Sequence, residues 1–287
     1  MKKKLSISDL YAMKERKEKA IWMTAYDAPF ASYAEKAGIE IILVGDSMGM
    51  VVYGMDGTVP VTMDMCINHC QAVRRGAPNT YIIGDMPFGS YHTSCEEAVA
   101  NAVRFYKEAD VDAIKLEGGV RVADKIKAIS DAGIVVFGHV GLTPQSSASM
   151  GGFKAQGRTV DSAKAVIDDA IAVYEAGART VLLEGVPEEV AKFIHELLPI
   201  PVYGIGAGTY NDGQVLVNGD TLGMFDSFTP KFAKKYANIS EIAIAAFETF
   251  VKEAKDGTFP AKEHKYKIID GIEEFEKLFD EYKNIKL

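Results

Sequence analysis

Charged and hydroxyl side chains stand at the ends of a series of apolar runs in this chain. They are Asp46 and Ser47 after IILVG, Asp85 after YIIG, Lys115 and Glu117 within AIKLEG, His139 after VVFG, and Glu184 after TVLL. A charge beside buried strand residues is costly unless it is paired or bound to a metal ion. One such group reads as a strand cap or a hydrogen-bonded histidine, but the whole series indicates a binding or catalytic site.

Three of these groups are carboxylates that follow neighbouring candidate strands: Asp46, Asp85 and Glu117. Hard oxygen ligands of this kind suit Mg²⁺, which typically takes one or two carboxylates and leaves positions for water and substrate. A thiolate or multi-histidine set would have indicated zinc, and these positions do not supply one. The sequence therefore predicts a magnesium site formed by Asp46, Asp85 and Glu117.

Lys115 and Glu184 could supply two further functions, a positive charge for the substrate and a base. Lys115 is two residues from Glu117 on one strand, so both side chains face the same side. The lysine could hold a substrate carboxylate or an enolate oxygen, or it could form a salt bridge that neutralises Asp85 or Glu117. Glu184 lies on another strand, outside the metal cluster, in an apolar setting that would raise its pKa and suit a general base for a C–H proton. Metal, cation and separate base together fit proton abstraction next to a metal-bound carbonyl.

These groups converge only if their strands are parallel and share one edge. Candidate strands cover residues 21–26, 39–45, 80–86, 113–118, 134–141, 180–186, 201–208 and, more weakly, 214–217; helix-like segments cover 27–37, 62–75, 94–108, 120–132, 160–177 and 187–198. Strict alternation of β and α segments predicts an α/β fold with a parallel sheet and helices outside it. We expect a (β/α)₈ TIM barrel, which gathers the carboxyl ends of its strands at one mouth. An open Rossmann-like sheet is the main alternative.

We expect residues 1–287 to form a single domain, with an N-terminal helix at 1–20, the barrel at 21–250 and a C-terminal extension at 251–287. No Pro/Ser-rich linker divides the chain, and no repeat beyond the βα rhythm is present. The extension has apolar residues three and four apart, which predicts an amphipathic helix docked on the barrel or on a neighbouring subunit.

The charge and hydropathy of the chain argue against nucleic acid and membranes as partners. The 32 basic and 40 acidic residues give a net charge of −8, which argues against a nonspecific nucleic-acid binder. Neither a signal-like apolar region nor an apolar run of about 18 residues occurs, so we expect no membrane partner and a cytoplasmic protein. Cys66, Cys70 and Cys95 suit reduced thiols. Cys66 and Cys70 flank His69 one helical turn apart, but without a second ligand pair they favour a structural helix face over a zinc site.

Several long motifs resemble those of the ketopantoate hydroxymethyltransferase family. They occur in order from about residue 20 to 265 and are TAYDAPFA, ILVGDSMGMVVYG, PVTMD, AVRRGAPN, GDMPFGSY, KLEGG, GHVGLTPQS, GGFKAQGR, LLEGVP, PVYGIGAG, DGQVLV and PKFAKKYA. The resemblance implies a barrel of the phosphoenolpyruvate mutase/isocitrate lyase superfamily. It also implies a homo-oligomer, often a decamer.

The same resemblance implies a reaction and roles for the residues. A hydroxymethyl group passes from 5,10-methylenetetrahydrofolate to 3-methyl-2-oxobutanoate through a Mg²⁺-stabilised enolate, giving 2-dehydropantoate and tetrahydrofolate on the route to pantothenate and coenzyme A. The matching positions are Asp46, Asp85 and Glu117 for the metal; Ser47, Asp46, Asp85, Lys115 and His139 for the substrate; and Glu184 for the base. The expected partners are thus a small 2-oxo acid and a folate.

The sequence departs from the family pattern in two mouth loops. Asn218 and Gly219 stand where an aromatic residue and a histidine are expected, and MDGTVP at 55–60 replaces a more usual D-T/S-T-L-P. Two other functions would be compatible with the same fold. A lyase or mutase of the same superfamily would be expected to carry a catalytic cysteine on its lid, and GGFKAQGR has none. A barrel kept only for binding or assembly would be expected to have lost its mouth acids.

Overall fold

The computed structural model describes residues 4–225, 229–283 and 285. The chain divides into two compact units, Met1–Ala237 and Asn238–Leu287. The first unit contains every strand of the described structure and every predicted site residue.

The first unit is an eight-stranded parallel barrel. Its strands are β1 (Trp22–Thr24), β2 (Ile41–Val44), β3 (Tyr81–Asp85), β4 (Ala113–Glu117), β5 (Val136–Gly141), β6 (Thr180–Glu184), β7 (Val202–Ile205) and β8 (Val215–Leu216). They pair in the order β7-β6-β5-β4-β3-β2-β1-β8. A parallel bridge between Gly204 and Gln214 joins the two ends. This order confirms the predicted (β/α)₈ TIM barrel and excludes the open Rossmann-like sheet, because the last strand returns to pair with the first.

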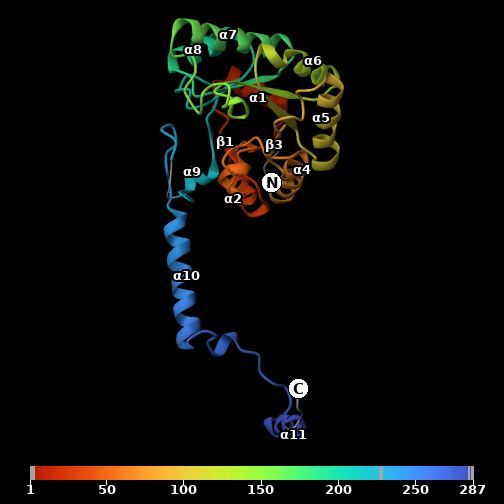
Figure 1. Ribbon diagram of the computed structural model, residues 1–287, viewed down its shortest axis with the longest axis vertical. Helices are drawn as coiled ribbons and strands as arrows, with labels where there is room; N and C mark the ends of the chain where they lie inside the picture. The colour runs from red at the N-terminus through yellow and green to blue at the C-terminus, as the bar shows by residue number, and fades with distance from the viewer. Residues whose placement is uncertain (1–3, 226–228, 284, 286–287) are drawn as a thin grey trace. The chain divides into compact units, whose positions relative to one another are not determined.

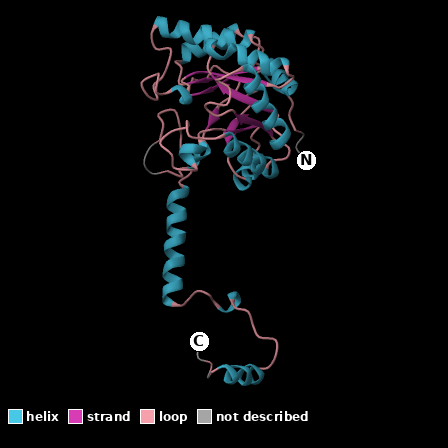
Figure 2. Ribbon diagram, turned by 45° about the vertical axis from the view of Figure 1, so that its right-hand side comes forward, coloured by secondary structure: helices cyan, strands magenta, loops and turns pink. Residues whose placement is uncertain are grey.

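Helices surround the strands, as Figures 1 and 2 show. The helices of this unit are α1 (Ile7–Glu15), α2 (Ala28–Ala37), α3 (Met48–Val51), α4 (Met63–Gly76), α5 (Cys95–Ala109), α6 (Ala123–Asp131), α7 (Val160–Glu175), α8 (Glu188–Leu197) and α9 (Asn218–Leu222), with short 3₁₀ turns η1 (Val120–Val122) and η2 (Pro144–Ser146). Five of the helices begin at a polar residue whose side chain accepts a hydrogen bond from the first turn: Ser6, Asp27, Thr62, Ser94 and Thr159. Such caps satisfy amide groups that have no partner within the helix.

Successive side chains along each strand point alternately into two apolar clusters, one outside the barrel wall and one inside it. One set of side chains, including Ile82, Ile114 and Val136, packs outward beneath the helices. The other set fills the inside of the barrel and includes Ile41, Leu43, Tyr81, Ile83, Ala113, Phe137, Leu182 and Tyr203. Because side chains alternate along a strand, Asp85, Lys115, Glu117, His139 and Glu184 continue the inward rows. They occupy the inward positions at the mouth end of β3, β4, β5 and β6.

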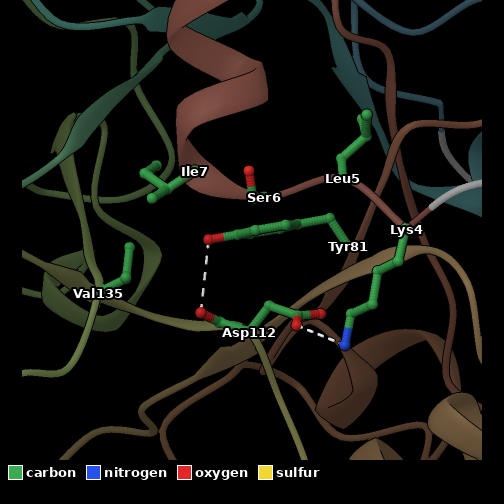
Figure 3. Close-up of a pocket in the computed structure, with 7 residues that line it drawn as sticks. All are labelled: Lys4, Leu5, Ser6, Ile7, Tyr81, Asp112 and Val135. Atoms are coloured by element: carbon green, nitrogen blue, oxygen red, sulfur yellow. Dashed lines mark hydrogen bonds and ion pairs between the residues drawn. The ribbon is translucent and has the colours of Figure 1, made fainter.

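The N-terminal segment packs at the opposite end of the barrel. Helix α1 begins with a capping box between Ser6 and Asp9, and Leu10 on this helix is buried with the inward cluster. Residues 4–7 line a pocket with Tyr81, Asp112 and Val135, where Lys4 Nζ lies 2.6 Å from Asp112 Oδ1 (Figure 3). The predicted N-terminal helix is therefore present, shorter than residues 1–20, and residues 1–3 lie outside the described part.

The second unit contains α10 (Ile239–Asp256), a short turn η3 (Lys262–His264) and α11 (Ile272–Tyr282). The expected amphipathic C-terminal helix is thus confirmed as α11, while its docking remains a prediction. The division at Ala237 differs from the expected barrel boundary at residue 250, which falls inside α10. The description of the chain as a single domain also remains a prediction. Among the residues that the structure describes, no helix is both long enough and apolar enough to span a membrane.

Candidate active site

The structure gathers the predicted residues at the mouth of the barrel. Asp46 and Ser47 follow β2, Asp85 ends β3, Lys115 and Glu117 lie on β4, His139 lies on β5, and Glu184 ends β6. The strand register sets Asp85 beside Lys115 and Glu117 beside His139. Asp46, Asp85, Lys115, Glu117 and His139 are all at least 96% buried. Ionisable groups at this depth must satisfy one another or a ligand.

Asp46, Asp85 and Glu117 form the carboxylate cluster of the site. Each offers an oxygen, and these three oxygens lie within 4.8 Å of one another. The amide of Asp46 donates to Asp85 Oδ2 at 3.0 Å. Gly45 permits this close turn, since a Cβ atom there would lie 2.9 Å from Ser47 Oγ. The predicted ligands thus share one small volume.

Lys115 supplies the positive charge within the cluster. Its Nζ lies 2.8 Å from Asp85 Oδ1 and 3.2 Å from Glu117 Oε1. Burial lowers the pKa of Lys115, but the charges of Asp85 and Glu117 outweigh this effect, so its pKa is raised overall. The salt bridge considered from the sequence is therefore present. It does not exclude a contact between the same ammonium group and a substrate.

The three carboxylates have different pKa values because their neighbours differ. Burial raises the pKa of Asp46, and the charges of Asp85 and Glu117 raise it further. Burial also raises the pKa of Asp85, although Lys115 opposes that shift. Burial would raise the pKa of Glu117 as well, but Lys115 and His139 outweigh it and hold the value at about 2. The cluster therefore holds more acid groups than its single lysine neutralises.

His139 lies between this cluster and Glu184. Its Nδ1 is 3.2 Å from Lys115 Nζ and 3.5 Å from Glu117 Oε1. Its Nε2 is 3.2 Å from Glu184 Oε2, although the atoms lack hydrogen-bond alignment. Burial and Lys115 lower the pKa of His139, yet Glu117 and Glu184 outweigh them and raise it to about 9. Glu184 thus lies beside a buried imidazole with its side chain 14% exposed, rather than in the purely apolar setting expected from the sequence.

Ser47 lies beside the carboxylates at the start of α3. Its hydroxyl is 2.8 Å from the hydroxyl of Tyr26, which comes from the loop after β1. The side chain of Ser47 is partly exposed, unlike those of its acidic neighbours. The hydroxyl is therefore oriented and open to a ligand.

The donor set fits a divalent cation. Asp85 Oδ1 is buried and makes an ion pair with Lys115, but accepts no hydrogen bond. A buried carboxylate oxygen left in this state has an unused coordination position. Since the three ligands are hard oxygens with no sulfur or imidazole among them, the set favours Mg²⁺ or Mn²⁺ over zinc.

Two buried residues at the site were not identified from the sequence: Gln145 in η2 and Tyr91 in the loop after β3. Gln145 donates to Asp46 Oδ2 at 2.8 Å through its side chain and to Glu117 Oε2 at 3.0 Å through its main chain. Tyr91 contacts both Gln145 and Glu117. Neither residue is ionised at neutral pH, so a search for charges at strand ends passes over them. The position of Gln145 at the end of HVGLTPQ, just beyond β5, was the available signal.

The other motifs have structural explanations. Cys66 and Cys70 are free thiols buried in the core on α4. Both thiols pack on the buried face of this helix, which agrees with the helix-face interpretation of these cysteines. The Asn218-Gly219 departure also packs locally. The main-chain amide of Asn218 donates to Thr24 Oγ1 at 3.1 Å, and a Cβ on Gly219 would lie 2.5 Å from the ring of Phe225.

Comparisons with known proteins agree on one family. The sequence profile described as ketopantoate hydroxymethyltransferase matches residues 4–262. A protein of Alkaliphilus metalliredigens named 3-methyl-2-oxobutanoate hydroxymethyltransferase is 64% identical over 283 residues, covering 99% of this chain and 100% of that protein. A protein of Heliobacterium modesticaldum with the same name is 50% identical over 270 residues, covering 94% of this chain and 98% of that protein.

Solved structures show the fold at lower sequence identity. A phosphoenolpyruvate phosphomutase from Streptomyces platensis subsp. rosaceus has a TM-score of 0.60 and 16% identity, with 98% of both chains covered. A 2,3-dimethylmalate lyase described as a PEP mutase/isocitrate lyase superfamily member has a TM-score of 0.58 and 17% identity, covering 96% of this chain and 98% of the other. The barrel therefore has the architecture of that superfamily.

Proposed function

The chain belongs to the ketopantoate hydroxymethyltransferase family, and we propose from the geometry of the barrel mouth how its residues carry out the reaction. It is a transferase that acts on a small molecule, 3-methyl-2-oxobutanoate, in the biosynthesis of pantothenate. The observation that carries the proposal is the arrangement of three buried carboxylates beside Lys115, with Glu184 set apart from them.

Asp46, Asp85 and Glu117 would hold the divalent ion, with Mg²⁺ as the physiological metal. When bound, Mg²⁺ supplies positive charge that polarises the keto group of the substrate and makes its C3 proton more acidic. Asp46 and Asp85 would contact the 2-oxo acid as well as hold the metal. The buried setting strengthens every charge interaction among these groups, because little water screens them.

Lys115 and Ser47 are the proposed anchors of the 2-oxo acid. The Lys115 ammonium group, at 2.8 Å from Asp85, remains positive and can bind developing negative charge on the substrate oxygen. The partly exposed Ser47 hydroxyl, oriented by Tyr26, can donate to the substrate carboxylate. The Lys115 and Ser47 donors, together with the bound metal ion, would thus hold C3 of the substrate in one orientation.

Glu184 is the proposed base that removes the C3 proton. It comes from β6, on the far side of His139 from the carboxylate cluster, so it is not needed to hold the metal. His139 lies between the two acidic regions, with Nδ1 3.5 Å from Glu117 Oε1 and Nε2 3.2 Å from Glu184 Oε2. We propose that His139 also contacts the substrate, as the family resemblance implies. A base held apart from the metal ligands can take up a proton without disturbing them.

The proposed one-carbon donor is 5,10-methylenetetrahydrofolate. In the transfer, C3 of the deprotonated substrate forms a bond to the methylene carbon, and both bonds from that carbon to the two folate nitrogens break. The nitrogens take up two protons, one equivalent to the proton lost from C3 and one from water. Water supplies the oxygen of the new hydroxymethyl group, and tetrahydrofolate leaves. The partners of the enzyme are therefore a 2-oxo acid and a folate.

Product formation tests this function. The purified protein, 3-methyl-2-oxobutanoate, 5,10-methylenetetrahydrofolate and Mg²⁺ are expected to give 2-dehydropantoate, detected by mass spectrometry. Replacing Mg²⁺ by EDTA is expected to stop the reaction, and restoring excess Mg²⁺ to restart it. Absence of product from folded protein with Mg²⁺ would contradict the proposal.

We also propose that the chain acts as a homo-oligomer in the cytoplasm, a decamer as the family resemblance implies. Within the second unit no residue of α10 is buried, and Ile242, Phe247 and Phe250 are 68%, 69% and 54% exposed. An apolar helix face of this size normally packs against another surface. Light scattering coupled to gel filtration is expected to give about ten times the mass of one chain, and a monomer would contradict this proposal. The three free thiols are consistent with a reducing compartment.

A further inference from the structure

Gln145 contacts two of the three carboxylates of the proposed metal site. Its side-chain Nε2 donates to Asp46 Oδ2 at 2.8 Å, and its main-chain amide donates to Glu117 Oε2 at 3.0 Å. Asp46 follows β2 and Glu117 lies on β4, and two carboxylates, which only accept hydrogen bonds, cannot bond directly to each other. One residue, 97% buried, therefore connects the two across the site.

The hydrogen bonds of Gln145 determine the orientation of its amide. The Nε2 group has two hydrogens, and they meet two acceptors, Asp46 Oδ2 and Met86 O at 3.0 Å. Oε1 receives the hydroxyl of Tyr91 at 2.6 Å. The reverse orientation would set Oε1 against a carboxylate and a carbonyl oxygen, which are acceptors only. Every side-chain polar atom of Gln145 is thus satisfied in one orientation.

Tyr91 fixes the Gln145 side chain by hydrogen bonding to both Gln145 and Glu117. It is fully buried, and its hydroxyl accepts a hydrogen bond from the main-chain amide of Glu117 at 3.1 Å while it donates to Gln145. The loop that carries Gln145 is itself a tight turn, in which Ser146 N donates to Thr143 O at 2.8 Å. The link between Asp46 and Glu117 is therefore rigid at both ends.

We propose that Gln145 is a positioning residue that sets the distance and orientation of Asp46 and Glu117 for the divalent ion, and that Tyr91 locks its amide. This inference rests on the proposed metal site and goes beyond it. Outer groups that orient metal ligands are typically worth about 10- to 100-fold in metal affinity. A neutral amide does this without adding a fourth negative charge to the cluster.

The test is Mn²⁺ binding in the absence of substrate, measured by the electron paramagnetic resonance signal of free Mn²⁺. Gln145→Met keeps the length of the side chain but removes its donors and acceptor. We expect the Mn²⁺ dissociation constant to rise by about 10- to 100-fold. Gln71→Met is the matched control, because the Gln71 amide donates only to the carbonyl of Glu108 on an exposed helix surface. Its Mn²⁺ dissociation constant is expected to equal that of the wild type.

Tyr91→Phe provides a second variant that removes only the locking hydroxyl. We expect a smaller rise in the dissociation constant, because Gln145 can still donate to Asp46. An unchanged dissociation constant in either variant, with a circular dichroism spectrum like the wild type, would overturn the proposal. Failure of both variants to fold would also overturn it, by assigning the pair to barrel stability instead.

The same titration separates this inference from the proposed metal site. If wild-type protein does not bind Mn²⁺, the metal site itself is wrong. If wild-type protein binds Mn²⁺, Asp85→Ala loses binding, and Gln145→Met binds as the wild type does, only the positioning role is wrong.

Discussion

His139 Nε2 lies 3.2 Å from Glu184 Oε2, while the other nitrogen of the same ring faces Lys115 and Glu117. The imidazole therefore separates the only carboxylate proposed as a base from the carboxylates proposed as metal ligands. This separation allows the two functions to be tested independently. A variant that affects the ligands should lose both metal binding and activity, and one that affects the base should lose activity alone.

Removal of a metal ligand should abolish binding of the ion. Asp85→Asn is nearly the same size as the wild-type residue but lacks the charge of the buried oxygen at 2.8 Å from Lys115. We expect the Mn²⁺ dissociation constant to rise at least about 100-fold, more than for loss of an outer partner, and transferase activity to fall to background. Isothermal titration and the product assay measure these effects. Retention of full Mn²⁺ affinity would contradict the assignment of Asp85 as a ligand.

Removal of the buried cation should make stability depend on the metal. Lys115→Met leaves three buried carboxylates without their counter-charge, and breaking a buried ion pair from one side costs about 3–5 kcal/mol. We expect a melting temperature lower by about 10 °C in EDTA. We also expect Mg²⁺ to raise it more than in the wild type, because the ion replaces the missing charge. Differential scanning calorimetry with and without Mg²⁺ measures this difference.

Lys127→Met is the control for that experiment. Lys127 pairs with Asp131 on a helix surface, where the two side chains are 66% and 64% exposed. Exposed pairs contribute about 0–1 kcal/mol, so its melting temperature should stay close to that of the wild type and respond normally to Mg²⁺. If Lys115→Met behaves like this control, Lys115 does not balance the charge of the cluster.

Asp212 should contribute to stability in a pH-dependent way. Its Oδ2 accepts from Val202 N at 2.8 Å and lies 2.9 Å from Lys14 Nζ, and its Oδ1 lies 2.9 Å from His195 Nε2. Burial raises the pKa of Asp212, but the hydrogen bonds to His195 and Val202 and the nearby Lys14 outweigh it and lower the pKa overall. The stabilisation is therefore complete above the unfolded pKa of about 4 and is lost as pH falls through the lower folded value.

Asp212→Asn tests that dependence. At pH 7 the variant should be less stable by about 2 kcal/mol, the usual value of a hydrogen bond to a charged group. The difference from the wild type should shrink as pH falls below about 4. Urea unfolding at a fixed protein concentration measures both. A difference that stays constant or grows toward low pH would contradict the assigned direction of the pKa shift.

Tight packing at Gly84 should also be detectable. A Cβ atom on this strand residue would lie 2.5 Å from Cδ1 of the buried Phe105 ring on α5. Gly84→Ala should therefore cost about 1–3 kcal/mol through overpacking, measured by urea unfolding at pH 7. Gly38→Ala would be a poor comparison because Gly38 has φ +90. Gly57→Ala meets no atom within 4 Å and serves as the control.

The sequence predicts the barrel and the charged part of the site because both depend on local patterns. Apolar runs mark the strands, and the alternation of side chains carries Ile83 to Asp85 and Ala113 through Lys115 to Glu117 along the same inward rows. Parallel strands bring their ends together. Adjacent acids at those ends are therefore neighbours in space without any knowledge of the loops.

The remaining features depend on loop geometry and on partners, which local patterns do not encode. Gln145 reaches Asp46 through a turn beyond β5, across 99 positions of sequence, and a neutral glutamine carries no charge signal. The setting of Glu184 beside His139 depends on which rotamers the barrel permits. The apolar pattern of α10 indicates a helix that packs against another surface, but the sequence does not identify that surface. The helix could therefore be assigned to the barrel, and the expected barrel boundary at residue 250 falls within it.

The central claim is that Glu184 removes the C3 proton of a substrate held at the carboxylate cluster. Its most direct test is deuterium uptake at C3 of 3-methyl-2-oxobutanoate in D₂O, followed by NMR without folate. We expect rapid exchange by wild-type protein with Mg²⁺ and none with EDTA. We expect none by Glu184→Gln either, although that variant should bind Mn²⁺ as the wild type does. No exchange by wild-type protein with Mg²⁺, or undiminished exchange by Glu184→Gln, would contradict the claim.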